Sequence, residues 1–254
     1  MFVACSTLCF AGEPLESALR HIAELEFSKI DLALVEGGPH LGPSAVAADL
    51  DAALHRVRHG PSLTPSGLEL DFGPIDRKAC LRRFEAICRF AKPLTVAVLT
   101  MKAAPLGSSF DDEVTRLSAL NEVAARQGLV LTVATHSETL TAEPAAAVAL
   151  CKAVPGLGLT LDPSHFVIGP NRGASFDEVY PYVQGVHFRD TGRDPGQFQV
   201  RVGQGVVEYN KIVTQLERHG YDRALTVAIH ERPDNPFDTE AEVRKLKLLL
   251  ESLI

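Results

Sequence analysis

The sequence predicts an α/β barrel of eight parallel strands, each followed by a helix. Three observations predict it. The chain has 254 residues, close to the usual length of one such barrel. Short β-type runs alternate with helix-type runs from end to end, and no low-complexity or Gly/Ser-rich linker interrupts them. The alternation repeats eight times, so we expect one domain spanning residues 1–254.

Eight runs rich in aliphatic and β-branched residues are the expected strands. They cover residues 3–8, 29–34, 67–72, 94–99, 129–134, 158–162, 185–188 and 225–230. Apolar residues at helical spacing predict helices at 14–23, 45–57, 77–90, 111–127, 142–154, 209–219 and 239–253, with a short helix near 175–178. A doubly wound open sheet is the alternative. No Gly-x-Gly-x-x-Gly follows an early strand, so the barrel is favoured.

Composition and charge argue against several classes of function. The formal net charge of −7 offers no general attraction for nucleic acid or for an anionic membrane. No run approaches the roughly 20 apolar residues of a membrane helix, and the N-terminus lacks the pattern of a signal peptide. The five cysteines form no zinc-type pair and suit reduced thiols. We expect a cytoplasmic protein with a small-molecule partner, and a homodimer is left open.

Polar side chains collect where the last four expected strands end. These ends are THSE (135–138), DPSH (162–165), HFRD (187–190) and HE (230–231). Functional groups of an α/β barrel lie at the C-terminal ends of its strands. Imidazole and carboxylate groups bind Zn²⁺, Mn²⁺ and similar ions, and imidazole moves protons near neutral pH. The sequence therefore predicts a shared site formed by these four strand ends.

These segments resemble the xylose isomerase-like barrels, a superfamily of sugar and sugar-phosphate isomerases and epimerases, hydroxypyruvate isomerases and endonuclease IV. The resemblance covers most of the chain and is strongest from Leu129 onward. Its most specific pieces are LDPSH (161–165), VHFRD (186–190), VGQGVVEY (202–209) and GYDRALTV (220–227). The resemblance implies the barrel fold and an isomerase or epimerase activity on a small carbohydrate or sugar phosphate.

Members of the superfamily typically hold one divalent metal with a Glu, an Asp, a His and a Glu on strands five to eight. The resemblance places the Asp at Asp162 and the strand-seven His at His187. Both glutamate positions hold alanine, Ala134 and Ala228. In the isomerases and epimerases that glutamate pair binds the metal and moves the substrate proton, and a methyl group does neither.

The resemblance also implies residues that contact substrate. His165 matches a position that commonly touches substrate in the family. An arginine a few residues past the strand-seven His often does so too, which here is Arg193, with Arg189 as a second candidate. His40, in the loop after the second expected strand, is a further candidate for reaching the barrel mouth from the far side.

The first hypothesis for the lost glutamates is an enzyme with a rebuilt metal site. His136 and His230 stand two residues beyond the two alanines, on the same face of their strands. Together with Asp162 and His187 they would form a His₃Asp set for one Zn, Mn, Co or Mg ion. The metal would polarise a sugar carbonyl while side chains move the proton. The expected catalytic groups are His136, His165, His230 and Glu138.

Two other hypotheses remain open at this stage. A metal-free protein could keep the polar ring and bind a sugar or polyol, either without catalysis or with altered chemistry. A nuclease similar to endonuclease IV is the third, but that activity resembles a three-metal site with more His and Glu ligands than this chain supplies, and the net charge is unfavourable.

Overall fold

The computed structural model describes residues 1–232 and 235–254 and contains a closed barrel of parallel strands. The strands are β1 (Phe2–Ser6), β2 (Lys29–Val35), β3 (Thr64–Asp71), β4 (Val98–Lys102), β5 (Val130–Ala134), β6 (Gly158–Leu161), β7 (Val183–Phe188) and β8 (Ala224–Val227). Each pairs with its neighbours in chain order, and β1 closes the barrel by pairing with β8. The predicted fold class is confirmed.

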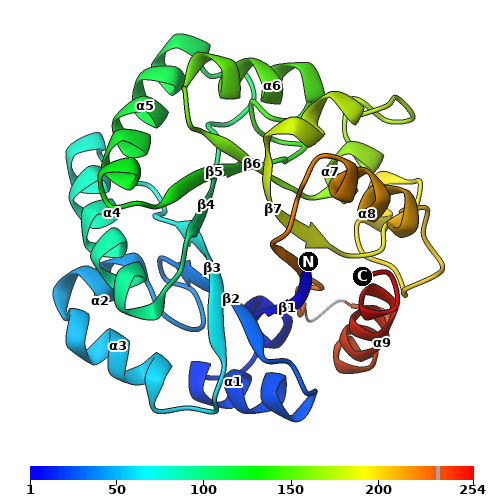
Figure 1. The fold of residues 1–254 in the computed structure, drawn as a ribbon, viewed down its shortest axis with the longest axis horizontal. Coiled ribbons are helices and arrows are strands. Elements are labelled where there is room, and N and C mark those ends of the chain that lie inside the picture. Colours follow the sequence, from blue (N-terminus) through cyan, green and yellow to red (C-terminus); the bar gives the residue numbers. More distant parts are fainter. Residues whose placement is uncertain (233–234) are drawn as a thin grey trace.

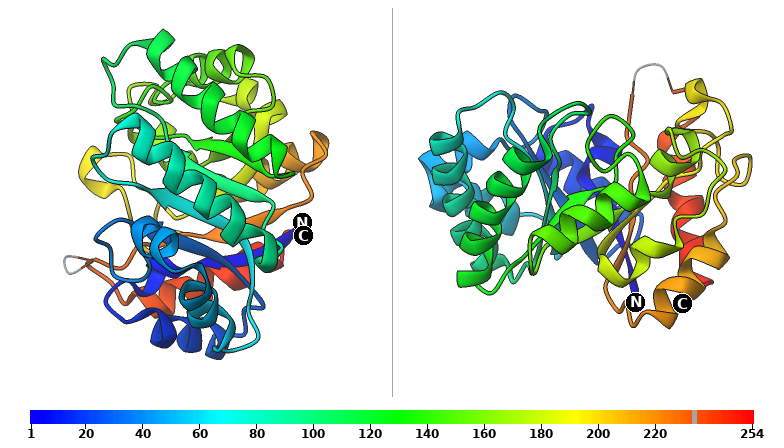
Figure 2. Two further views of the ribbon diagram at one scale, coloured as in Figure 1. Left: turned by 90° about the vertical axis from the view of Figure 1, so that its left-hand side faces the viewer. Right: turned by 90° about the horizontal axis from the view of Figure 1, so that it is seen from above.

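Helices surround the strands as an outer ring (Figure 1). They are α1 (Leu15–Glu24), α2 (Pro43–Ala48), α3 (Leu50–Arg58), α4 (Arg77–Ala91), α5 (Phe110–Arg126), α6 (Pro144–Ala153), α7 (Pro163–Ile168), α8 (Tyr209–Arg218) and α9 (Thr239–Glu251). Short 3₁₀ turns lie at η1 (Thr7–Phe10), η2 (Lys92–Leu94), η3 (Asp177–Tyr182) and η4 (Pro195–Gln197). The two chain ends lie close together (Figure 2).

The helices bury the apolar faces that their sequences predict. In α1, Leu15, Ala18, Leu19 and Ile22 are buried, a spacing that places them on one side of the helix. In α9, the buried residues Val243, Leu246 and Leu250 likewise lie on one side of the helix. The core therefore lies between the helix ring and the outer face of the barrel. Among the described residues, no helix is both long and apolar enough to cross a membrane.

Several expected boundaries were wrong. The first and eighth strands end at Ser6 and Val227 and not at Leu8 and His230, and two further differences have local reasons. The fourth strand was expected at 94–99 but spans Val98–Lys102, because η2 precedes it and Thr95 has a left-handed backbone (φ 57°) that no strand continues through. The helix expected at 45–57 is two helices, α2 and α3. Asp49 between them is extended and accepts a hydrogen bond from the Ala52 amide, which begins α3.

Two features after β6 also differ from expectation. Helix α7 was not predicted. Asp162 caps it by accepting a hydrogen bond from the Ser164 amide at 3.0 Å, and Pro163 takes its first position. The helix expected near 175–178 is the 3₁₀ turn η3, which contains Pro181. Because Asp162 directly follows β6 and caps α7, its carboxylate is held in one orientation at the barrel mouth.

Candidate functional site

A cavity of about 680 Å³ lies beyond the C-terminal ends of β5 to β8, and we call it the mouth cavity. Its polar lining comprises His136, Ser137, Glu138, His165, Arg189, Gln199, His230, Glu231 and Arg232. The four groups expected to act catalytically are therefore brought together. A volume of this size suits a small ligand.

A second cavity of about 810 Å³ adjoins the mouth cavity at the ends of β3 and β4. Both cavities are lined by His136 and Glu138, which therefore stand at their boundary. The lining of the second cavity is more apolar and includes Phe72, Leu81 and Met101. A ligand held at the boundary has room to extend in either direction.

His165 is a neutral imidazole with a defined tautomer. Its Nδ1 accepts a hydrogen bond from the Ser137 amide at 3.2 Å, which leaves the ring proton on Nε2. Burial lowers the pKa of His165 to about 3, and the opposing charge of Asp162 does not offset it. At neutral pH His165 thus offers an uncharged N–H donor.

His136 is a second imidazole of the same kind. Its ring stacks on that of His165, with 4.0 Å between the centroids, and its Nδ1 accepts a hydrogen bond from the Glu138 amide at 3.2 Å. Burial also lowers the pKa of His136. The segment after β5 therefore uses two backbone amides, those of Ser137 and Glu138, to orient two neutral imidazoles that carry their ring protons on Nε2. The Nε2 of His165 lies 3.9 Å from Asp162 Oδ2.

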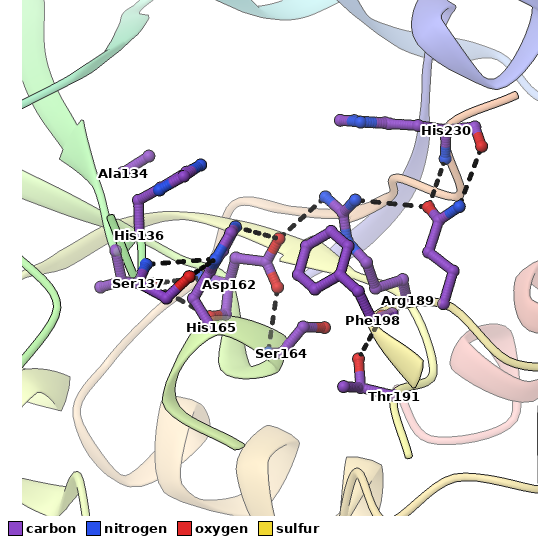
Figure 3. A network of polar contacts seen from close by, with 12 residues as sticks. Ala134, His136, Ser137, Asp162, Ser164, His165, Arg189, Thr191, Phe198 and His230 are labelled. Carbon is purple, nitrogen blue, oxygen red and sulfur yellow. Dashed lines mark hydrogen bonds and ion pairs between the residues drawn. The ribbon is translucent and has the colours of Figure 1, made fainter. Parts of the chain in front are cut away.

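Arg189 and Asp162 form a buried ion pair at the base of the mouth cavity (Figure 3). Arg189 Nη2 lies 2.8 Å from Asp162 Oδ2, and both residues are 3% exposed. Arg189 Nη1 donates to Gln199 Oε1 at 3.3 Å, and the Phe198 ring lies 4.8 Å from the guanidinium. Burial alone would raise the pKa of Asp162, but the charge of Arg189 holds it below the ordinary value.

His187 points into the barrel interior and pairs with a residue far away in the sequence. Its Nε2 donates to Asp31 Oδ2 on β2 at 2.7 Å, and both side chains are buried. Burial alone would lower the pKa of His187, but the hydrogen bond and charge of Asp31, with the charges of Glu69 and Asp162, raise it to about 9. His187 is therefore a protonated partner of Asp31.

The sequence matches the xylose isomerase-like TIM barrel family over residues 19–249. The chain belongs to this family. No curated protein matches the sequence significantly. Among solved structures, a xylose isomerase-like TIM barrel protein from Mycobacterium smegmatis in complex with magnesium is 19% identical, with a TM-score of 0.76 over 99% of this chain and 97% of that one.

Two further solved structures are similar to this chain. A D-allulose 3-epimerase from Methylomonas sp. is 16% identical, with a TM-score of 0.76 over 100% of this chain and 98% of that one. A probable 3-DHS dehydratase from Bacillus anthracis is 18% identical, with a TM-score of 0.73 over 97% and 98% of the two chains. At these identities the likeness establishes the fold.

The divalent metal of the family does not fit the residues present here. Asp162 is paired with Arg189, and His187 is paired with Asp31. In residues 1–232 and 235–254, no group of three or more His, Cys, Asp or Glu side chains is arranged to hold a metal ion. His136 and His230 line the cavity but do not complete the expected His₃Asp set.

Two predicted substrate contacts lie away from the mouth cavity. Arg193 lines a different cavity of about 770 Å³, next to α7, η3 and α8. His40 is buried, and its Nε2 lies 3.2 Å from the Phe10 carbonyl. Neither is among the residues that line the mouth cavity.

Sequence patterns gave no reason to expect the role of the segment that includes Phe198 and Gln199. Gln199 accepts a hydrogen bond from the His230 amide at 2.7 Å and donates to the His230 carbonyl at 3.0 Å. It thereby ties the segment after β7 to the end of β8 while contacting Arg189. A glutamine in a connecting segment carries no motif, so only the fold reveals that it positions two residues of the site.

Proposed function

We propose that this protein is an isomerase acting on a small hydroxy-carbonyl compound, a sugar or sugar phosphate, bound in the mouth cavity. The observation that carries the proposal is the pair of stacked, neutral imidazoles of His136 and His165 in a cavity that Glu138 also lines. Family membership supports a carbohydrate ligand, because solved relatives include sugar epimerases.

The chemistry needs a base and a donor. Removing a proton from the carbon beside a carbonyl gives an enediolate, whose oxygen must be stabilised. The Nε2–H groups of His165 and His136 can donate to that oxygen without carrying charge, as neutral imidazoles do in other isomerases. Glu138, at the same rim, is the group that takes the proton and returns it to the neighbouring carbon. The hydroxyl proton beside that carbon passes, by way of an imidazole Nε2, to the former carbonyl oxygen, and the carbonyl thereby moves by one position.

Isomerisation by one base fits this site better than epimerisation. Inverting a carbon centre requires a second group that supplies a proton from the opposite face. His230 lies on the far side of the Asp162–Arg189 pair from His136 (Figure 3). Burial, with the positive charge of Arg189, lowers the pKa of His230 well below its ordinary value, so it is a poor source of that proton. We assign His230 to substrate binding.

Binding without turnover is the second candidate, favoured by the alanines at 134 and 228, where the family has proton-moving glutamates. The test is proton NMR of aldoses, ketoses and their phosphates incubated with the protein in D₂O. The proposal expects deuterium at the carbon beside the carbonyl and formation of the isomeric sugar.

Matched variants separate the two candidates. Glu138→Gln should abolish exchange, and His165→Ala should slow it by about 10²–10³-fold through loss of a donor to the enediolate. His59→Ala, an exposed histidine at the end of α3, is the control and should exchange normally. A sugar that binds, as measured by calorimetry, but takes up no deuterium would contradict the proposed isomerase activity and support binding without turnover.

A further inference from the structure

We infer that the guanidinium of Arg189 takes the place of the family's divalent metal, so that the mouth of this barrel carries a permanent cation of its own. The guanidinium would be the source of positive charge in the site whichever reaction, if any, takes place there.

The position of the guanidinium supports the replacement. Asp162 matches the family's aspartate ligand, and the atom that its Oδ2 meets is Arg189 Nη2, at 2.8 Å. The Ala228 amide donates to the Phe188 carbonyl, which places Ala228 beside Arg189 on the adjoining strand. Ala134 ends β5 on the Asp162 side (Figure 3). The arginine thus lies between the remaining carboxylate, Asp162 after β6, and the alanine after β8, while Ala134 lies on the other side of Asp162.

The charges support it as well. A site with three carboxylates matches a doubly charged ion, whereas a buried guanidinium carries a single charge. Three carboxylates around Arg189 would leave excess negative charge in a place of low dielectric, which is costly. One carboxylate, Asp162, balances it. The two alanines and the arginine are therefore compatible in charge.

Arg189 is fixed in this position and still has donors to spare. Gln199 accepts from one terminal nitrogen, and Phe198 packs on the guanidinium face. Its Nε is buried with no hydrogen-bond partner in the described part of the chain. Arg189 lines the mouth cavity, so the guanidinium is placed to meet a negatively charged oxygen of a ligand, as a metal would.

Calorimetric titration with Mn²⁺ and Mg²⁺ tests the inference on three proteins: wild type, Ala134→Glu/Ala228→Glu, and the triple variant that adds Arg189→Ala. Wild type should bind neither ion. The triple variant, which regains two carboxylates and loses the cation, should bind Mn²⁺ at least about 100-fold more tightly than wild type. The double variant, which keeps Arg189, should bind far more weakly than the triple variant. Equal binding by the double and triple variants would overturn the inference.

A second measurement uses the unaltered protein, in case the triple variant does not fold. A ligand that binds only the folded state raises the unfolding temperature. Thermal unfolding of wild type in millimolar Mn²⁺, Mg²⁺ or Zn²⁺ should therefore match unfolding in EDTA. A metal-dependent rise in the unfolding temperature that Asp162→Asn removes would show that the ion enters the site beside Arg189, and would overturn the inference.

Discussion

The buried pair of Asp31 and His187 makes a stability prediction that can be worked through from the structure. The two side chains are joined by a 2.7 Å hydrogen bond in the barrel interior, and each is nearly inaccessible to solvent. Asp31→Asn keeps the size of the side chain and removes its charge. The protonated His187 then loses the partner that keeps it charged, with only Glu69 and Asp162 left as opposing charges nearby.

Two routes give the magnitude. Removing one partner of a buried pair costs about 3–5 kcal/mol. A pKa of about 9 for His187, against about 6.5 in the unfolded chain, corresponds to about 3 kcal/mol. Because the folded pKa is raised, this stability is fully present below about pH 6.5 and is lost as the pH rises through 9.

Urea unfolding followed by circular dichroism at pH 6, 7.5 and 9 measures the effect. The free-energy difference between wild type and Asp31→Asn should be about 3 kcal/mol at pH 6 and shrink steadily toward pH 9. Asp222→Asn, an exposed aspartate before β8, is the control and should change little at any pH. A penalty below about 1 kcal/mol at pH 6, or one that is the same at all three values, would refute the reasoning.

Three further predictions concern neighbouring parts of the fold. Gly205→Ala should lower the free energy of unfolding in urea by about 1–3 kcal/mol, because an added Cβ would clash with Asp190 Oδ1. The Asp190 carboxylate cannot move away easily, since it accepts hydrogen bonds from the Gly203 and Gly205 amides. Gly196→Ala, which has open space around its Cβ position, is the control and should leave the stability unchanged. Burial raises the pKa of Glu69, so the wild type loses stability as the pH rises above the pKa of this group in the unfolded chain. The stability of Glu69→Gln relative to wild type, measured by urea unfolding, should therefore increase from pH 4 to pH 7. A stability difference that does not change with pH would contradict this. Arg189→Met should cost about 3–5 kcal/mol by leaving Asp162 unpaired, and a cost below about 1 kcal/mol would show that the pair is dispensable.

The barrel, and the cavity lined by its polar strand ends, were predictable from the sequence. The hydrophobic periodicities of strands and helices differ, so the eight alternating strand and helix segments can be recognised in the sequence. Because functional groups of such barrels lie at the C-terminal ends of the strands, His136, His165 and His230 could be named as candidates, and all three line the mouth cavity. The fourth strand was misplaced because Leu94 and Val96 are apolar and buried although they precede the sheet. Apolar character reports burial, and it does not by itself report backbone conformation.

The pairings within the site could not be predicted. His187 and Asp31 are 156 residues apart, and no local pattern links them. Arg189 follows a strand by one residue, and the sequence alone does not show whether it turns to solvent or back over Asp162. Such choices depend on which side chains share the barrel mouth after it closes. The missing glutamates were visible in the sequence, whereas the cation beside Asp162 was not.

Deuterium uptake from D₂O into small sugars, measured with and without EDTA, tests the central claim most directly. The claim is that the side chains at the barrel mouth transfer a proton without a divalent metal. It predicts exchange at the carbon beside the carbonyl at the same rate in both conditions, lost in Glu138→Gln. Exchange that stops in EDTA and returns with added Mn²⁺ or Mg²⁺, or no exchange into any sugar, would contradict it.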